Sequence, residues 1–112
     1  MSVVYEFLGS KSIPSNQSSN TFIELSGKLE DYDFLILNTG GITDQSSLVA
    51  WQKVEGLSST QTVYFYSSAS EGRYLMQIYV QPNYSGNKDA VVARNNTSNS
   101  SRTLYVYGVK AE

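Results

Sequence analysis

The sequence predicts an all-β domain of about eight short strands, arranged as an antiparallel β-sandwich or a small barrel. Three observations support this prediction. Runs of β-branched and aromatic residues recur about every ten residues, segments rich in Gly, Asn and Ser separate these runs, and no segment spaces its apolar residues as an amphipathic helix does. Because the chain has 112 residues, we expect a single domain that spans residues 1–112.

The expected strands follow one another along the whole chain. Each is a short run of residues that favour extended structure, and each is bounded by turn-forming residues. The long polar segment Gly9–Asn20 is expected to be a loop. The strands are expected at Val3–Leu8, Thr21–Leu25, Phe34–Asn38, Leu48–Val54, Gln61–Ser67, Tyr74–Gln81, Ala90–Ala93 and Thr103–Lys110.

Apolar alternation indicates which side chains of the earlier strands face the core. In the second strand, Ile23 and Leu25 are expected to point inward. The run Phe34–Leu37 has no alternation, so we expect a central strand that is covered on both faces.

The fifth and sixth strands alternate clearly. Tyr64 and Tyr66 are expected to point outward or toward a neighbouring molecule. The side chains expected to face the core are Val63, Phe65, Tyr74, Met76, Ile78 and Val80.

The last strand is apolar on one side and aromatic on the other. Leu104 and Val106 alternate with Tyr105 and Tyr107. A partner subunit could cover the aromatic side, because homo-oligomer interfaces are rich in aromatic residues. Alternatively, the tyrosines simply tolerate a wet sheet face with their hydroxyls in water. On the first alternative, Tyr64, Tyr66, Tyr105 and Tyr107 form the oligomer interface.

Charge and hydropathy exclude several partners. With 8 basic and 10 acidic residues, the chain has a net charge of -2 and lacks the basic excess that binding to nucleic acid requires. No segment approaches the length of an apolar membrane span, and the start MSVVYEFLGSKS does not have the regions of a signal peptide. We therefore expect no nucleic-acid or membrane partner, and synthesis in a cytoplasm.

The chain contains no cysteine and no histidine. Disulfides, metal sites built from these residues, Cys nucleophiles and triads that use imidazole as a base are therefore excluded. A pair of carboxylates remains chemically possible, but the sequence does not indicate a cleft. We predict a protein that is not an enzyme, with no catalytic residues, no metal site and no cofactor.

Two short motifs are interpreted as structural. Glu30, Asp31 and Asp33 could supply oxygen ligands to calcium, but their spacing matches no EF-hand loop. We interpret them as a solvated turn before a buried strand. The NTGG segment lacks the pattern of a phosphate-binding loop, so it is interpreted as a turn in which glycine supplies positive φ.

Aromatic residues flanked by amides are the best candidates for ligand binding. Trp51 is the only tryptophan, and Tyr84 lies in the loop sequence PNYSGN beside Asn83 and Asn87. Proteins bind sugars by stacking C–H groups on aromatic rings while amides hydrogen-bond to the hydroxyls. These four residues are the predicted ligand-binding set, and the alternative for Trp51 is a place in the core.

Both ends of the chain resemble a known family. The segments YEFLGSKS and SSNTFIELSGKLEDYDFLILNTGG resemble a pattern found in small β-domains of tailed bacteriophages and prophages. That pattern is a first strand that ends in Leu-Gly, a polar loop, an I-x-L strand, and L-x-x-Y-D before an apolar run. The closing RTLYVYGVK is similar to the terminal strand of these domains. The matching positions are Leu8, Gly9, Tyr32, Asp33, Tyr107 and Gly108.

This resemblance implies a jelly-roll β-sandwich on a tail tip, tail fibre, baseplate or head fibre. It implies a virion structural or host-attachment protein, often a trimeric receptor-binding knob that recognises cell-surface polysaccharide. A homotrimer, other virion proteins and host polysaccharide are then the expected partners, and the virion is the expected location. A stand-alone carbohydrate-binding module and a capsid decoration protein are the alternatives.

Overall fold

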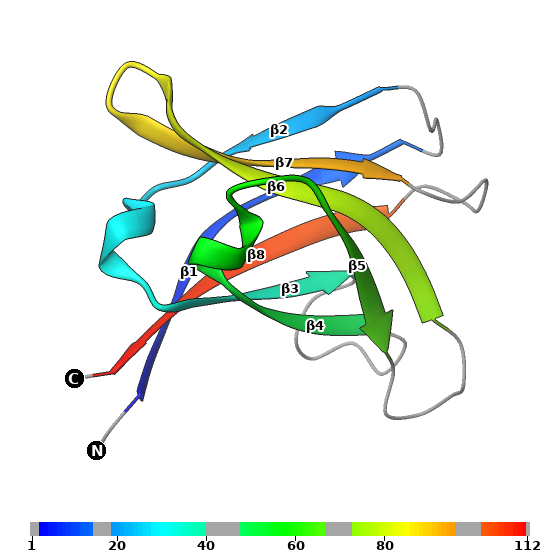
Figure 1. The fold of residues 1–112 in the computed structure, drawn as a ribbon, viewed down its shortest axis with the longest axis horizontal. Coiled ribbons are helices and arrows are strands. Elements are labelled where there is room, and N and C mark those ends of the chain that lie inside the picture. Colours follow the sequence, from blue (N-terminus) through cyan, green and yellow to red (C-terminus); the bar gives the residue numbers. More distant parts are fainter. Residues whose placement is uncertain (1–2, 15–18, 40–47, 67–72, 96–101, 112) are drawn as a thin grey trace.

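The computed structural model describes residues 3–14, 19–39, 48–66, 73–95 and 102–111 (Figure 1). Within these residues, strands dominate and two short 3-10 helices interrupt them. The elements are β1 (Val3–Ile13), β2 (Thr21–Glu24), η1 (Leu29–Asp31), β3 (Phe34–Thr39), β4 (Leu48–Lys53), η2 (Val54–Leu57), β5 (Gln61–Tyr66), β6 (Arg73–Ser85), β7 (Lys88–Asn95) and β8 (Arg102–Ala111).

The strands form two packed antiparallel layers. Their order is β1-β8-β3-β4-β5-β6-β7-β2, and the paired strands are antiparallel. Among the described residues, β4 and β5 pair only at Val49 and Tyr66, so the sheet divides there. The first sheet is β1-β8-β3-β4 and the second is β5-β6-β7-β2. The predicted all-β antiparallel sandwich of about eight strands is confirmed.

The jelly-roll part of the prediction is not confirmed. From β3 to β7, each strand pairs with the strand that precedes or follows it in the sequence. Only the ends of the order cross over: β8 lies between β1 and β3, and β2 lies beside β7.

The first strand is longer than predicted. Gly9–Ile13 was expected to be loop, and this expectation is wrong because these residues pair with Arg102–Val106 of β8. A register shift between Phe7 and Gly9 allows the strand to continue as a β-bulge. Gly9 is required there, because an added Cβ would lie 2.7 Å from the backbone oxygen of Glu24.

At the bulge, β1 lies against β2, the edge strand of the second sheet. The two sheets therefore meet here as well as at the pair that joins β4 to β5. The backbone N–H of Ser26 donates to the backbone oxygen of Leu8 at 2.9 Å, and Nζ of Lys11 donates to the backbone oxygen of Phe22 at 3.2 Å. The layers therefore approach each other along both long edges.

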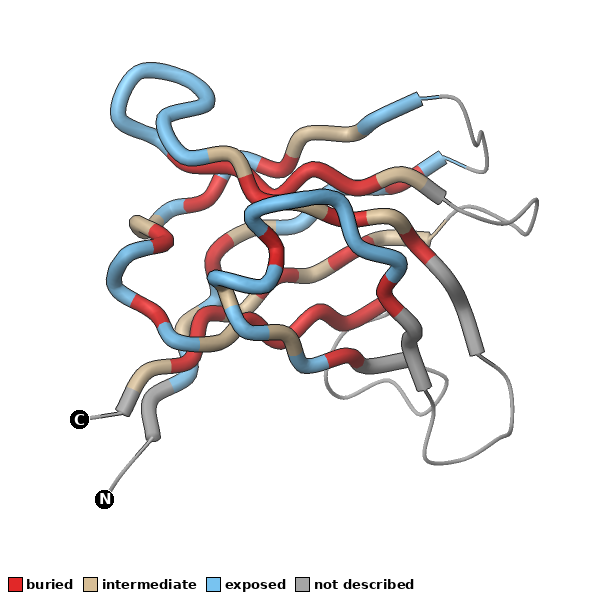
Figure 2. The backbone as a smooth tube through the Cα atoms, viewed as in Figure 1, coloured by how far each residue is buried: buried red, intermediate tan, exposed pale blue. Residues whose placement is uncertain are grey.

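The core lies between the layers (Figure 2). Leu35 and Leu37 of β3 point into it, whereas Ile36 is buried on the other face, so the prediction that this strand is covered on both faces is confirmed. Phe65 and Tyr74 were also predicted inward, and their side chains lie outside the described part of the structure. The apolar side of β8, Leu104 and Val106, is buried. The other predicted core residues are all buried: Ile23, Leu25, Val63, Met76, Ile78 and Val80.

Tyr32 closes one end of the sandwich. An added Cβ at Gly108 would lie 2.5 Å from its ring, and one at Gly27 would lie 2.8 Å from its hydroxyl oxygen, so both glycines are needed. The Tyr32 hydroxyl donates to Oε2 of Glu6 at 3.2 Å, and Nζ of Lys110 lies 3.0 Å from Oε1. Burial, followed by the charge of Glu6, raises the pKa of Tyr32.

Neither 3-10 helix of the described residues has the length and hydropathy needed to cross a membrane.

Candidate functional site

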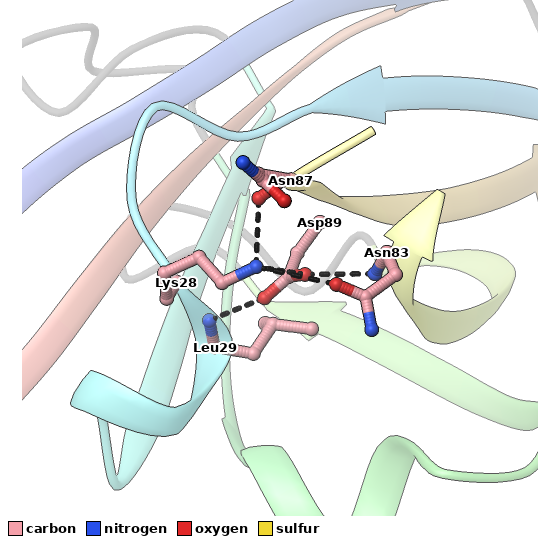
Figure 3. Close-up of polar contacts among 5 residues, drawn as sticks. All are labelled: Lys28, Leu29, Asn83, Asn87 and Asp89. Carbon is pink, nitrogen blue, oxygen red and sulfur yellow. Dashed lines mark hydrogen bonds and ion pairs between the residues drawn. The ribbon is translucent and has the colours of Figure 1, made fainter. Parts of the chain in front are cut away.

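A buried carboxylate anchors the hairpin between β6 and β7 (Figure 3). Asp89, near the start of β7, is only 3% exposed. Its Oδ1 accepts a hydrogen bond from the backbone N–H of Asn83 at 2.9 Å, and its Oδ2 accepts one from the backbone N–H of Leu29 at 2.8 Å. One side chain thus joins the hairpin to the first turn of η1.

Lys28 completes this anchor. Its ammonium group lies 3.2 Å from Oδ1 of Asp89, 2.7 Å from the backbone oxygen of Asn87 and 3.4 Å from Oδ1 of Asn83. An ammonium group has three donors, and here each has an acceptor from the hairpin. The positions of both asparagines relative to η1 are therefore set by polar contacts.

The environment keeps Asp89 ionised. Burial by itself raises the pKa of this carboxyl, but the hydrogen bonds from Asn83, Leu29 and Lys28 outweigh burial and lower the pKa below its ordinary value. Asp89 is thus a negatively charged acceptor with well-defined donors.

The local sequence explains the shape of the hairpin. Gly86 and Asn87 form a two-residue turn between the paired Ser85 and Lys88, and Gly86 adopts a φ of 61°. Asn83 also has a positive φ, 55°, within a register shift of β6. Asparagine tolerates this conformation better than most residues. The turn is much shorter than the predicted one, which ran from Pro82 to Asp89.

A pocket of about 340 Å³ opens between the hairpin and η1. Its lining combines an exposed carboxylate, the Lys28 ammonium and the amide of Asn83. The lining residues are Lys28, Leu29, Glu30, Pro82, Asn83 and Asp89. The lining therefore places two carboxylates, an amide and an ammonium group whose donors are already paired within the protein around an open space.

Tyr84 extends from the same hairpin and is 37% exposed. Its ring stacks on that of Phe22 in β2, with 4.8 Å between the centroids and an interplanar angle of 14°. Phe22 thus fixes the orientation of Tyr84 and covers one of its faces.

The structure does not bring Trp51 to the hairpin. Trp51 belongs to β4 of the first sheet, and Figure 1 shows β4 on the opposite side of the molecule from the β6–β7 hairpin. It is 53% exposed, so it is not a core residue, and its ring meets those of Tyr5 and Phe34 edge-on. The four predicted ligand-binding residues are therefore divided between two regions, with Asn83, Tyr84 and Asn87 in one.

Trp51 belongs to a surface that we call the aromatic face, the outer face of the first sheet. One row across it is Phe7, Tyr107, Ile36 and Trp51, and a second row is Tyr5, Val109, Phe34 and Lys53. Tyr105 lies on the same face, and Phe7 packs against both Tyr105 and Tyr107.

The predicted interface tyrosines lie on both sheets. Tyr105 and Tyr107 of β8 are half-buried on the aromatic face, which agrees with the predicted two-sided strand. Tyr64 and Tyr66 belong to β5, and their side chains lie outside the described part of the structure.

Sequence reasoning missed several residues. Tyr5 and Phe7 are on the aromatic face, and their spacing of two within VVYEF was a signal for a shared face. The pairing of Lys28 with Asp89 left no such signal, because 61 residues separate them.

The acidic segment behaves as a polar turn. Glu30, Asp31 and Asp33 are exposed, and the backbone N–H of Asp33 donates to Val109 at 3.1 Å. Among the described residues, no group of three or more Asp or Glu side chains is arranged to hold a metal ion. Glu30 and Asp33 instead line a second open pocket of about 450 Å³, together with Lys53.

Comparison of the chain with protein-family models, with curated proteins and with solved structures finds no match in any of the three.

Proposed function

We propose that this chain is a non-catalytic attachment module of a virion that binds a cell-surface glycan at the β6–β7 hairpin. The observation that carries the proposal is the Asp89 anchor, which holds two amide-bearing residues, Asn83 and Asn87, beside an open pocket. A site that is already ordered loses little conformational freedom when a ligand binds.

The chemistry of the hairpin suits a sugar. The exposed side chains of Asn83 and Asn87 can each donate and accept, as pairs of sugar hydroxyls require. The Glu30 carboxylate at the pocket can accept from further hydroxyls. The exposed part of the Tyr84 ring offers a surface for the C–H groups of a sugar.

The virion part of the proposal rests on the resemblance to phage domains. Two of its motif positions, Tyr32 and Gly108, contact each other in the structure, which supports reading these two positions together. Gly9 permits the approach of Glu24, and Gly108 makes room for the ring of Tyr32. The backbone N–H of Asp33 donates a hydrogen bond to the backbone oxygen of Val109, the residue after Gly108.

Calorimetric titration with a panel of purified capsular polysaccharides and teichoic acids tests glycan binding. We expect Tyr84→Ala and Asn87→Ala to weaken binding to a positive polysaccharide at least tenfold. Asn87→Ala keeps the backbone oxygen that Lys28 contacts, so the hairpin should retain its fold. The control is Thr62→Ala, an exposed substitution on β5. Unchanged affinity in both hairpin variants would contradict the proposed site.

Mass spectrometry of purified particles tests the virion assignment. The chain should be present in particles that are purified from the bacteria that encode it. If the chain binds glycan but is absent from particles, the stand-alone carbohydrate-binding module is the correct alternative.

A further inference from the structure

The aromatic face is unusual for the outer surface of a sandwich. Among its described positions, Lys53 is the only charged residue. Tyr5 is 57% exposed, and Phe7 and Trp51 are each 53% exposed. Enrichment in aromatic residues and depletion of charge is the composition of the buried centre of a protein interface. The residues of the face are Tyr5, Phe7, Phe34, Ile36, Trp51, Tyr105, Tyr107 and Val109, with the polar Ser10 and Asn38 in the row of Tyr105 and Lys53 at the margin.

The aromatic side chains of this face contact one another across the sheet and form one continuous surface. Strands β8 and β3 separate β1 from β4, which places their backbones roughly 14 Å apart. Nevertheless, the ring centroids of Tyr5 and Trp51 are 6.5 Å apart. Both side chains must therefore lean across the sheet toward each other. They cover Ile36 and Val109, which are buried although they point away from the core.

We propose that the aromatic face is a self-association surface, and that its occupant is the same face of a second copy of this chain. In a twofold pair, each patch meets itself, so a patch that carries one sign of charge repels its copy. The chain has a net charge of -2, yet the described positions of this face include no carboxylate. Two such faces can pack against each other with Lys53 of each copy at the margin of the contact.

The available area fits a weak dimer. An aromatic side chain has roughly 150–250 Å² of surface, so three half-exposed rings and three partly buried ones offer about 500 Å² per copy. A pair would bury about 1,000 Å², the lower limit for a specific interface. We therefore expect a dissociation constant in the micromolar range and a dimer that separates on dilution.

The ring geometry favours a protein surface over a polysaccharide on this face. The rings of Tyr5 and Phe34 stand at 74° and 69° to the ring of Trp51. They do not share a plane on which consecutive sugars could stack. Side chains of a second copy can instead fill the steps between the rings.

Sedimentation equilibrium combined with tryptophan fluorescence tests the proposal on the full chain. Because Trp51 is the only tryptophan, its emission reports on this face alone. We expect a shift from a 12.4 kDa species to a dimer as the concentration rises, with a parallel blue shift of the Trp51 emission. A single monomeric species at all concentrations up to the millimolar range would overturn the proposal. So would a trimer or dimer that forms without any change in emission.

Charge substitutions locate the interface. Phe7→Glu and Trp51→Glu are each expected to raise the dimer dissociation constant at least tenfold, because they place carboxylates opposite each other. The matched control, Thr62→Glu, adds the same charge to the outer face of the second sheet and should leave association unchanged. Far-UV circular dichroism verifies folding, and Phe7→Glu provides the result if Trp51→Glu does not fold. If the control weakens dimer formation equally, or if the blue shift of the Trp51 emission requires added polysaccharide, the proposal is contradicted.

These variants do not touch the hairpin, so glycan binding and self-association can fail separately.

Discussion

The β6–β7 hairpin and the aromatic face both expose aromatic side chains, but the contacts that order the two regions differ. In the hairpin, directional hydrogen bonds from Asn83, Leu29 and Lys28 converge on the buried Asp89. On the aromatic face, rings meet at centroid distances of 5.4 to 6.5 Å without such bonds. Hydrogen bonds fix the positions of individual polar atoms, whereas ring contacts can adjust. The first arrangement suits a small polar ligand and the second suits an apolar partner surface.

The outer face of the second sheet carries more polar and charged side chains than the aromatic face. There, Thr62, Gln77 and Arg94 form one row, and Arg94 donates to the side-chain oxygen of Gln77. Gln81 and Glu24 lie in another row. Between these two rows, Phe22, Val92 and Tyr79 form a row of apolar and aromatic residues, so this face mixes polar and apolar side chains. Each sheet of a sandwich needs only one apolar face, so the aromatic residues of the first sheet exceed what folding requires.

The largest effect is expected when the hairpin anchor is removed. Asp89→Ala leaves the backbone N–H groups of Asn83 and Leu29 without their acceptor and should lower the free energy of unfolding by about 3 kcal/mol. Urea denaturation measures this loss. The control, Asp31→Ala, removes an exposed carboxylate and should change stability by about 0.5 kcal/mol or less. Similar losses in both variants would show that the buried contacts do not stabilise the fold.

A smaller loss is expected beneath the aromatic face. Gly108→Ala forces a Cβ to within 2.5 Å of the Tyr32 ring and should cost about 2 kcal/mol, in the range of overpacked cores. Gly56→Ala is the matched control, because an added Cβ there would meet no atom within 4 Å. Urea denaturation measures the free energy of unfolding of both variants. Full stability of Gly108→Ala would mean that Tyr32 is not held against β8.

Acidification should weaken the hairpin through Asp89. The pKa of this carboxyl is lower in the folded than in the unfolded chain, so its stabilising contribution is complete above the ordinary value of 3.8 and is lost as the pH falls through the folded value. Urea midpoints measured from neutral to acidic pH should therefore fall. In Asp89→Asn, the urea midpoint should fall less over the same pH range, because the asparagine side chain does not titrate. Parallel pH profiles of the two proteins would argue against a lowered pKa.

The smallest effect concerns the aromatic face itself. Trp51→Thr should lower the free energy of unfolding by about 1 kcal/mol or less when measured on dilute protein, because about half of the side chain is already in water. The same substitution is expected to reduce self-association strongly. A stability loss as large as that of Asp89→Ala would instead show that Trp51 stabilises the monomer.

Local sequence was enough to predict most of the strands and their inward side chains. Strand side chains alternate with a period of two, so Ile23, Met76 and Ile78 could be assigned to the core from their neighbours alone. The same argument predicted the two-sided β8. It failed at Gly9–Ile13, because a polar strand that pairs at the edge carries no apolar alternation.

The candidate site was only partly predictable. Asn83, Tyr84 and Asn87 are neighbours in the sequence, so one hairpin necessarily presents them together. The Lys28–Asp89 pair and the distance of Trp51 from the hairpin depend on which strands become neighbours. Side-chain periodicity specifies the faces of a strand but not its partners. The sequence by itself thus determined an all-β chain with one aromatic strand face, and the tertiary structure decided which distant residues meet, because those contacts form only when the sheets pack.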